Sequence, residues 1–237
     1  MKNINTTTAA KSSHVNEQKA IGASVSSTFE ELYLKKDYKG AANNLLQNKQ
    51  QLNSSIFHYN LGTVYSKMGD YPAARFHLEK AIKEGYINSS SLNNLTYVKS
   101  QLQVDDISTS TNLPDQLMNT ALTIPPAAYS SFSLILLLLG ITLLKSKKLI
   151  KKTSIVFFVA LILAPVLFSQ GYLNKINYAV AFNDVPIYEG PSKIFSEKGK
   201  VKAGSKIILG EYKEGWFYIK FPISLAGWIS KDQLGLY

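Results

Sequence analysis

Two long apolar runs interrupt the otherwise mixed pattern of hydrophobic and polar residues along the chain. The first, 128–144, reads AYSSFSLILLLLGITLL, and the second, 154–173, reads SIVFFVALILAPVLFSQGYL; neither contains a charged residue. Each approaches the roughly 20 apolar residues with which an α-helix spans a bilayer core. A buried hairpin in a soluble domain is the alternative, but two adjacent helices that are apolar all round are hard to cover in a chain of this size. The pattern predicts transmembrane helices over 127–144 and 154–173.

The segment between the two runs, residues 145–153, contains five lysines and no acidic residue. The outer flanks differ, because residues 113–128 contain neither Lys nor Arg and only Lys175 closely follows the second run. Short loops rich in Lys and Arg stay on the cytoplasmic side of a membrane. We therefore expect a cytoplasmic loop, with both flanking regions on the opposite side. In the inner membrane of a bacterium, that side is the periplasm.

The N-terminal residues 1–25 are rich in Ser, Thr, Asn, Ala and Lys and show no apolar period, so we expect a disordered tail. They also lack the apolar stretch of about 7 to 15 residues that defines a signal peptide. Export of the N-terminal region would then depend on the first span or on a start further upstream. The third alternative is the inverted orientation.

From residue 26 to residue 104, apolar positions recur with a helical period. One predicted helix carries its apolar face at Phe57, Leu61, Val64, Tyr65 and Met68. A second helix, after the turn at Gly69-Asp70, carries its apolar face at Ala74, Leu78, Ala81 and Ile82. The small residues Gly62 and Ala74 would allow the two antiparallel helices to approach closely.

This stretch, HYNLGTVYSKMGDYPAARFHLEKAI at 58–82, resembles a tetratricopeptide repeat. The residues with the family's spacing are Leu61, Gly62, Tyr65, Ala74 and Ala81. The departures from the family pattern are His58, Leu78 and Tyr86, where Trp, an aromatic residue and Pro are usual. A degenerate earlier copy, KKDYKGAANNLL at 35–46, precedes its counterpart by 33 residues, and 89–103 is predicted to form a capping helix. The resemblance implies a short α-solenoid of about two repeats and a cap.

Such a solenoid presents a groove for a peptide or a partner helix. The candidate partner-binding residues in this region are Asn60, Thr63 and Lys67. Recognition of a terminal carboxylate would also need an array of Lys and Arg, and the corresponding positions hold Ser26, Glu30, Ser90 and Asn94. The ligand class is therefore not readable. His58 and His77 lie on different predicted helices without a third ligand, so we interpret them as packing or surface residues and predict no metal site.

Residues 105–126 are polar, end in two prolines and are predicted to form a linker. Beyond the apolar hairpin, residues 178–237 change to short runs rich in β-branched and aromatic residues, separated by Gly, Pro and Asn. The run WFYIKF at 216–221 alternates as a strand with one buried face does. About five such strands in 60 residues predict a small barrel.

This C-terminal region resembles a bacterial SH3 domain. The residues that carry the resemblance are Gly190-Pro191-Ser192, Gly204, Gly215-Trp216 and Gly227-Trp228. The acidic loop and the tyrosine pair of proline-binding SH3 domains are not evident, so a PxxP ligand is not supported. Tyr188, Trp216 and Trp228 are candidate binding residues; the alternative is that these aromatic side chains are partly core.

The formal net charge of +10 suggests nucleic acid until it is divided along the chain. Residues 1–128 contribute +2, residues 129–177 contribute +6 and residues 178–237 contribute +2. Most of the surplus thus belongs to the predicted membrane segment, where lysines meet anionic headgroups. No basic stripe with interleaved aromatic residues is present in the soluble regions, so we expect no nucleic-acid binding.

Candidates for catalysis are few. The chain has no cysteine, and all three histidines lie within the first 77 residues. We find no GxSxG, P-loop, HExxH or dinucleotide-binding glycine motif, and we interpret the pair Asp105-Asp106 as solvated surface charge. The sequence therefore predicts neither enzymatic activity nor a cofactor.

The order of tetratricopeptide-like repeats, two apolar spans with a lysine loop, and an SH3-like domain resembles the E component of the Bat aerotolerance system of bacteria. The resemblance covers nearly the whole chain after residue 26, although the missing signal sequence departs from the usual family start. It implies action beside membrane-bound von Willebrand A-domain proteins and a MoxR-type AAA+ ATPase, in envelope stress or oxygen tolerance.

The fold class that we expect is thus a multidomain α and β membrane protein with a short solenoid, two spans and a small barrel. The leading functional hypothesis is a non-enzymatic adaptor or scaffold that binds protein partners. The alternative is a cell-wall sensor whose SH3-like domain binds peptidoglycan. A third reading, a subunit of a cell-wall hydrolase, would require a catalytic group that we do not find.

Overall fold

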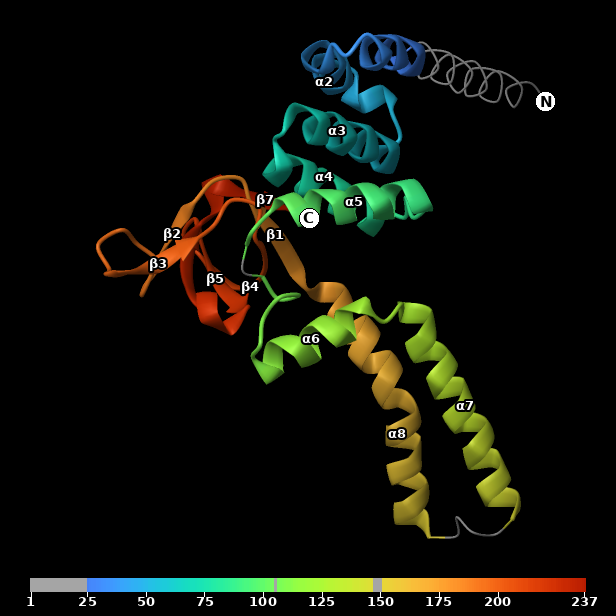
Figure 1. Ribbon diagram of the computed structural model, residues 1–237. Helices are drawn as coiled ribbons and strands as arrows, with labels where there is room; N and C mark the ends of the chain where they lie inside the picture. Colours follow the sequence, from blue (N-terminus) through green and yellow to red (C-terminus); the bar gives the residue numbers. More distant parts are fainter. Residues whose placement is uncertain (1–24, 105, 147–150) are drawn as a thin grey trace, which may run out of the picture.

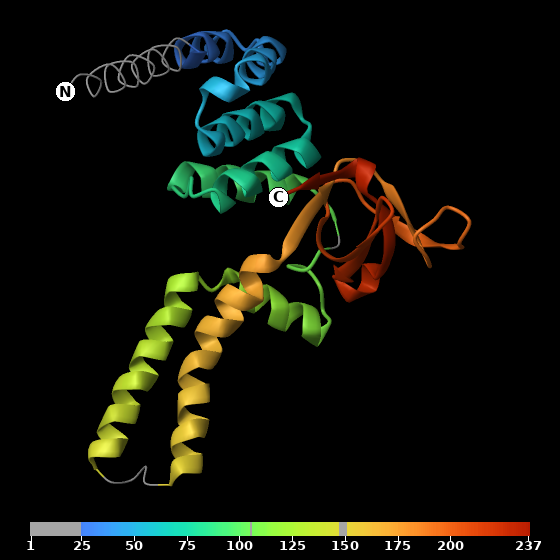
Figure 2. The same cartoon turned by 180° about the vertical axis from the view of Figure 1, so that it is seen from behind.

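The computed structural model describes residues 25–104, 106–146 and 151–237, which form a stack of helices, a long helical hairpin and an antiparallel sheet (Figure 1). The predicted tail, except for Val25, lies outside the described residues, as does the middle of the lysine-rich loop. In both views the helical stack and the sheet lie at the same end of the hairpin (Figures 1 and 2).

The helical stack begins with helical residues 25–34 and continues with four α-helices. These are α2 (Tyr38–Gln47), α3 (Ser54–Met68), α4 (Tyr71–Lys83) and α5 (Ser89–Gln101). Each of the four begins after an Asp or Asn whose side chain accepts a hydrogen bond from a backbone N–H of the first turn, at positions 37, 53, 70 and 88. The helices predicted around 57–68, 74–82 and 89–103 are therefore present.

The α3–α4 pair is held together by close packing across a glycine. A Cβ atom at Gly62 would lie 2.8 Å from Leu78 Cγ and 3.2 Å from the carbonyl oxygen of Ala74. Leu61 and Leu78, on the predicted apolar faces, are fully buried, whereas Met68 at the end of α3 is largely exposed. The predicted role of Gly62 and Ala74 in a close approach is thus confirmed.

Residues 105–126, predicted as a linker, contain a further helix, α6 (Leu113–Thr123), with Pro114 in its first turn. Its inner face packs through Met118 and Leu122 against a buried cluster formed by Ile107, Ile176 and Ile208. The apolar residues of α6 are interspersed with polar residues, so that the polar composition of the segment conceals the helix.

The hairpin consists of α7 (Pro126–Lys145) and α8 (Lys152–Gly171), which pack against each other along their length (Figure 2). Gly140 faces the Phe158 ring so closely that a Cβ atom would lie 2.7 Å from it. Most other apolar side chains of the two helices are exposed. Both helices are long and apolar enough to cross a membrane.

The C-terminal region forms one antiparallel sheet of seven strands. The strands are β1 (Asn177–Ala181), β2 (Val185–Tyr188), β3 (Glu197–Val201), β4 (Lys206–Lys213), β5 (Trp216–Phe221), β6 (Gly227–Ser230) and β7 (Leu234–Leu236). Their order is β3-β2-β6-β5-β4-β1-β7, and the core includes Val185, Ile207, Ile219 and Ile229. The prediction of β structure is confirmed, but the sheet has seven strands where about five were predicted. It is not closed into the predicted barrel, since β3 and β7 form its two edges.

His58 on α3 and His77 on α4 pack their rings against each other across the α3–α4 pair. Their Nδ1 atoms are 2.7 Å apart and their ring centroids 4.9 Å apart. Phe57, Phe76 and Tyr65 surround the pair. One Nδ1 must donate and the other accept, so the accepting ring must be neutral and the two rings cannot both be protonated. Burial lowers the pKa of His58 to about 4 and that of His77 to about 3.

This pair predicts acid-dependent stability. An unfolded histidine binds its proton near pH 6.5, whereas the folded pair stays neutral, so stability falls as pH decreases from 6.5 to 4.5. We expect a loss on the order of 3 kcal/mol across this range. The expected loss of stability can be tested by measuring the thermal unfolding midpoint of the full chain in detergent between pH 6.5 and pH 4.5.

The double variant His58→Leu with His77→Leu provides the comparison, because it removes both titrating rings. Its midpoint should stay nearly constant between pH 6.5 and 4.5. The carboxylates of the chain protonate mainly below this range, so they do not obscure the difference. If the unfolding midpoint depended on pH equally in the wild type and the double variant, the histidine pair would not take up protons on unfolding.

Candidate binding surfaces

A polar and aromatic groove of about 480 Å³ lies on the helical stack, between the helix at 25–34, α3 and α5. Its lining residues are Tyr33, Tyr59, Thr63, Ser66, Lys67, Ser90, Asn93, Asn94 and Tyr97. Two predicted site residues, Thr63 and Lys67, thus line this groove together. The third, Asn60, is half-buried on α3 and is not among the lining residues.

The groove wall is fixed by its own contacts. Asn94 Nδ2 donates a hydrogen bond of 3.3 Å to Thr63 Oγ1, which itself donates to the carbonyl oxygen of Tyr59 at 2.9 Å. The Tyr59 ring lies against that of Tyr86, with ring centroids 4.6 Å apart. Exposed Asn93 and Lys67 remain available for hydrogen bonds to a ligand. The groove thus offers aromatic rings for apolar contact, and amide groups and one ammonium group for hydrogen bonds. This combination suits an extended peptide.

A second surface lies on the outer face of the sheet, where aromatic side chains of three adjacent strands meet. Tyr188 on β2, Trp228 on β6 and Tyr218 on β5 are direct cross-strand neighbours. The Tyr188 and Trp216 rings meet edge to face at 5.4 Å, and those of Tyr218 and Trp228 at 5.7 Å. We call these four residues the aromatic surface.

The structure thus brings together the three aromatic residues that the sequence singled out, and it adds Tyr218. The alternation in WFYIKF contained the information needed to find Tyr218. Ile219 is buried in the core, so Trp216 and Tyr218 share the opposite, outward face of β5. All four side chains of the aromatic surface are partly buried and partly exposed, and Tyr218 is 37% exposed.

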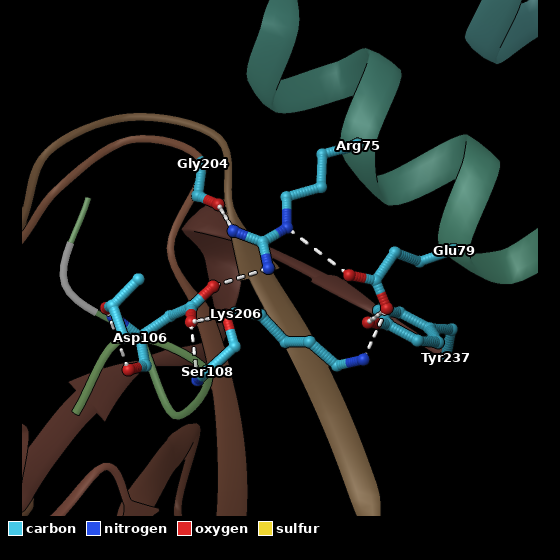
Figure 3. A network of polar contacts seen from close by, with 8 residues as sticks. Arg75, Glu79, Asp106, Ser108, Gly204, Lys206 and Tyr237 are labelled. Atoms are coloured by element: carbon cyan, nitrogen blue, oxygen red, sulfur yellow. Dashed lines mark hydrogen bonds and ion pairs between the residues drawn. The ribbon is translucent and has the colours of Figure 1, made fainter. Parts of the chain in front are cut away.

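A buried ion cluster joins α4 of the helical stack to the segment at 106–108 and to the sheet (Figure 3). Arg75 is only 1% exposed, and its Nη2 contacts Asp106 Oδ2 at 2.5 Å. Its Nη1 donates to the carbonyl oxygen of Gly204 at 2.9 Å, and its Nε contacts Glu79 Oε1 at 3.3 Å. Lys206 binds the second oxygen of Glu79.

Every charge in this cluster has an opposite partner. The Tyr237 hydroxyl donates to Glu79 Oε2 at 3.0 Å, and Asp106 Oδ1 accepts from Ser108 N at 2.7 Å. Burial alone would raise the pKa of Glu79, but Lys206 and Arg75 hold that pKa below its ordinary value. Arg75 and Ser108 outweigh burial in the same way and lower the pKa of Asp106.

Gly204 contributes to this junction through its backbone. Its φ of +86° lies in the left-handed region that favours glycine, and a Cβ atom there would lie 2.5 Å from Leu102 Cδ2. The close approach of the β3–β4 turn to the helical stack therefore depends on a residue without a side chain.

The interpretation of the pair Asp105-Asp106 as solvated surface or helix-start charge is wrong for Asp106, which is 2% exposed, paired with Arg75 and not at the start of a helix. Asp105 lies outside the described residues. The cluster was missed because Asp106 and Gly204 lie 31 and 129 residues from Arg75 in the sequence. Among the described residues, no group of three or more His, Cys, Asp or Glu side chains is arranged to hold a metal ion.

Comparisons of the chain with protein-family models, with curated proteins and with solved structures found no match.

The ion cluster predicts a large effect of a single truncation. Arg75→Ala would leave the Asp106 and Glu79 carboxylates buried without their main partner, at a cost of about 3 to 5 kcal/mol. Thermal unfolding of the full chain in detergent should show a much lower midpoint.

Lys35→Ala is the matched control, because Lys35 forms an i,i+4 ion pair with Glu31 that is exposed to solvent. This variant should leave the midpoint unchanged. Similar midpoints for the two variants would contradict a stabilising role of the cluster.

Proposed function

We propose that the chain is a membrane-anchored, non-enzymatic adaptor that binds a protein partner in the groove between α3 and α5. The observation that carries the proposal is the groove itself, where Thr63 and Lys67 lie with the rings of Tyr59 and Tyr97 in a space of about 480 Å³. Grooves on stacked helix pairs commonly receive peptides or partner helices.

The position of the hairpin supports an anchoring role. The outward apolar surface of α7 and α8 suits lipid, and the lysines at positions 145, 151 and 152 favour a cytoplasmic side for the loop end of the hairpin. The helical stack and the sheet lie at the opposite end (Figure 1). In the bacterial inner membrane both would then face the periplasm.

Partner identity follows from the resemblance to the Bat aerotolerance system. The helical stack would act as tetratricopeptide repeats and the sheet as a bacterial SH3 domain. The proposed partners are membrane-bound von Willebrand A-domain proteins and, through them, a MoxR-type ATPase, in envelope stress or oxygen tolerance. The residues that line the groove offer aromatic, hydroxyl, amide and ammonium groups, which suit contact with a protein partner.

Crosslinking in intact membranes, followed by purification of the full chain, tests the adaptor proposal. The wild type should recover a von Willebrand A-domain protein. Lys67→Glu combined with Tyr97→Ala removes a cation and a ring from the groove and should lower recovery about tenfold, equivalent to about 1.4 kcal/mol of binding free energy.

Lys39→Glu makes the same charge change at an exposed lysine of α2 outside the groove, so it should leave recovery unchanged. The Tyr97→Ala change removes a side chain that is already half exposed, and circular dichroism can check that the helical stack is intact. Recovery of no A-domain protein, or equal recovery by all three forms, would refute the adaptor proposal.

The aromatic surface favours a second candidate function, peptidoglycan binding by the sheet. Exposed aromatic rings provide flat apolar faces against which sugar rings can stack, and Tyr188, Trp216, Tyr218 and Trp228 form one continuous group of such rings. A cell-wall sensor would use this surface, whereas an adaptor that acts only through the groove has no need of it.

Sedimentation of the detergent-solubilised full chain with purified sacculi tests this alternative. We expect a sensor to sediment and the variant Trp216→Ala with Tyr218→Ala to remain in solution. Tyr212→Ala is the control, since Tyr212 is also exposed but lies on β4 outside the aromatic surface. If the wild-type chain stayed in solution with the sacculi, the proposed cell-wall function would be refuted.

A further inference from the structure

The helix α6 has two apolar faces, of which only one is covered by protein. Met118 and Leu122 form the inner face against the buried cluster at Ile107 and Ile208. On the opposite side, Leu113 is 66% exposed and Leu117 is 62% exposed. Leu113, Leu117, Thr120 and Ile124 recur with a helical spacing of three to four residues, so they share one outward face.

This outward face contains no charged side chain. The single acidic residue of α6, Asp115, is completely buried on the side toward the sheet. Two exposed leucines one turn apart, flanked by Thr120 and exposed Ile124, form a small apolar ridge along one side of α6. The ridge has no cover within the part of the chain that the structure describes.

The position of α6 relates this ridge to the hairpin. Both views show one end of α6 beside the upper end of α8, with the rest of the helix extending below the sheet (Figures 1 and 2). Because the inner face of α6 packs on Ile176 and Ile208 of the sheet region, the opposite face is directed away from the soluble body. The views place α6 on the side of the sheet toward which α7 and α8 extend (Figures 1 and 2).

Contacts at both ends hold α6 in this position. Near its N-terminus, the backbone N–H of Ile223 donates to Asp115 Oδ1 at 3.0 Å, and Ser110 Oγ donates to Asp115 Oδ2 at 2.5 Å. Near its C-terminus, the Tyr129 hydroxyl of α7 donates to the carbonyl oxygen of Ala121 at 2.8 Å. Only Ile124 and Pro125 separate α6 from α7, so α6 cannot move far from the end of the hairpin.

Side chains at this level of the hairpin are those typical of a membrane–water boundary. Tyr129 and Tyr172 lie on either side of Phe168 near the upper ends of α7 and α8. Lys220 of the sheet lies 5.1 Å above the Tyr172 ring and donates to its hydroxyl at 2.9 Å. Tyrosine and lysine concentrate where the hydrocarbon core meets the headgroups.

We propose that α6 lies flat in the headgroup region of the bilayer, with Leu113 and Leu117 inserted among the upper parts of the acyl chains. The proposal depends on the membrane location of the hairpin in the proposed function. Interfacial helices place their apolar face about 5 to 10 Å into this boundary. The soluble body would thus rest on the membrane by a third contact besides the two spans.

A lipid surface fits the ridge better than a protein partner does, because α6 adjoins the hairpin directly. If α7 and α8 span the bilayer, the chain at Ile124 already lies at its surface, and an apolar face turned along the direction of the spans meets lipid first. The absence of charge on this face removes the desolvation cost that a lysine or a glutamate would add there.

Nitroxide accessibility in lipid nanodiscs tests the proposal on the full chain. The chain has no cysteine, so Leu117→Cys, Phe157→Cys and Lys39→Cys each provide one labelling site. The discs contain phosphatidylethanolamine and phosphatidylglycerol, and relaxation by oxygen is compared with relaxation by a water-soluble nickel chelate. We expect the label at position 117 to collide more with oxygen than with nickel, at about 5 to 10 Å depth.

The two reference sites separate this inference from the proposed function. Phe157 is 72% exposed on α8 and should report deep lipid, whereas Lys39 on α2 should report water. If position 157 reports lipid but position 117 is as accessible to nickel as position 39, α6 is not in the membrane. If position 117 is shielded from both reagents, protein covers the ridge and the inference is also overturned. If position 157 itself reports water, the membrane location in the proposed function fails.

Discussion

The buried ion cluster around Arg75 is the interaction on which the arrangement of the soluble parts depends. Removing a guanidinium group and two carboxylates from water costs several kcal/mol for each ion, and that cost is offset only when all the partners are in place. Asp106 of the 106–108 segment, Gly204 of the β3–β4 turn and Lys206 at the start of β4 reach Arg75 and Glu79 of α4. The cluster is therefore favourable only when the helical stack, the 106–108 segment and the sheet are assembled together.

Because these parts assemble together, the groove and the aromatic surface have a fixed position relative to each other. The groove lies on α3 and α5, and both helices pack against α4, which carries Arg75 and Glu79. The aromatic surface lies on strands β2, β5 and β6 of the sheet that supplies Lys206. Phe76 of α4 also packs edge to face against Phe182 beside the sheet, at 5.4 Å. A ligand in the groove and a ligand on the aromatic surface would thus be held at a constant separation.

The sequence predicted features that depend on neighbouring residues and missed those that depend on distant ones. The helices at Leu61 and Leu78, the hairpin and the alternating strand at 216–221 could be recognised because their apolar positions repeat locally. The ion cluster could not, since Arg75 meets Asp106 and Gly204 only after the chain has folded. Helix α6 was missed for two reasons. Its apolar residues are divided between two faces, so they do not form a single apolar stripe, and the two prolines that follow them suggest a linker.

The division of the apolar residues of α6 between two faces has a structural consequence. A helix that packed on the sheet through Met118 and Leu122 alone would gain nothing from Leu113 and Leu117, which lose conformational freedom and remain exposed in water. Placing the second face against lipid would add the burial of two large side chains to the helix. The same helix would then connect the core of the sheet to the bilayer surface, so that the ion cluster, the sheet and the hairpin support one orientation of the soluble body.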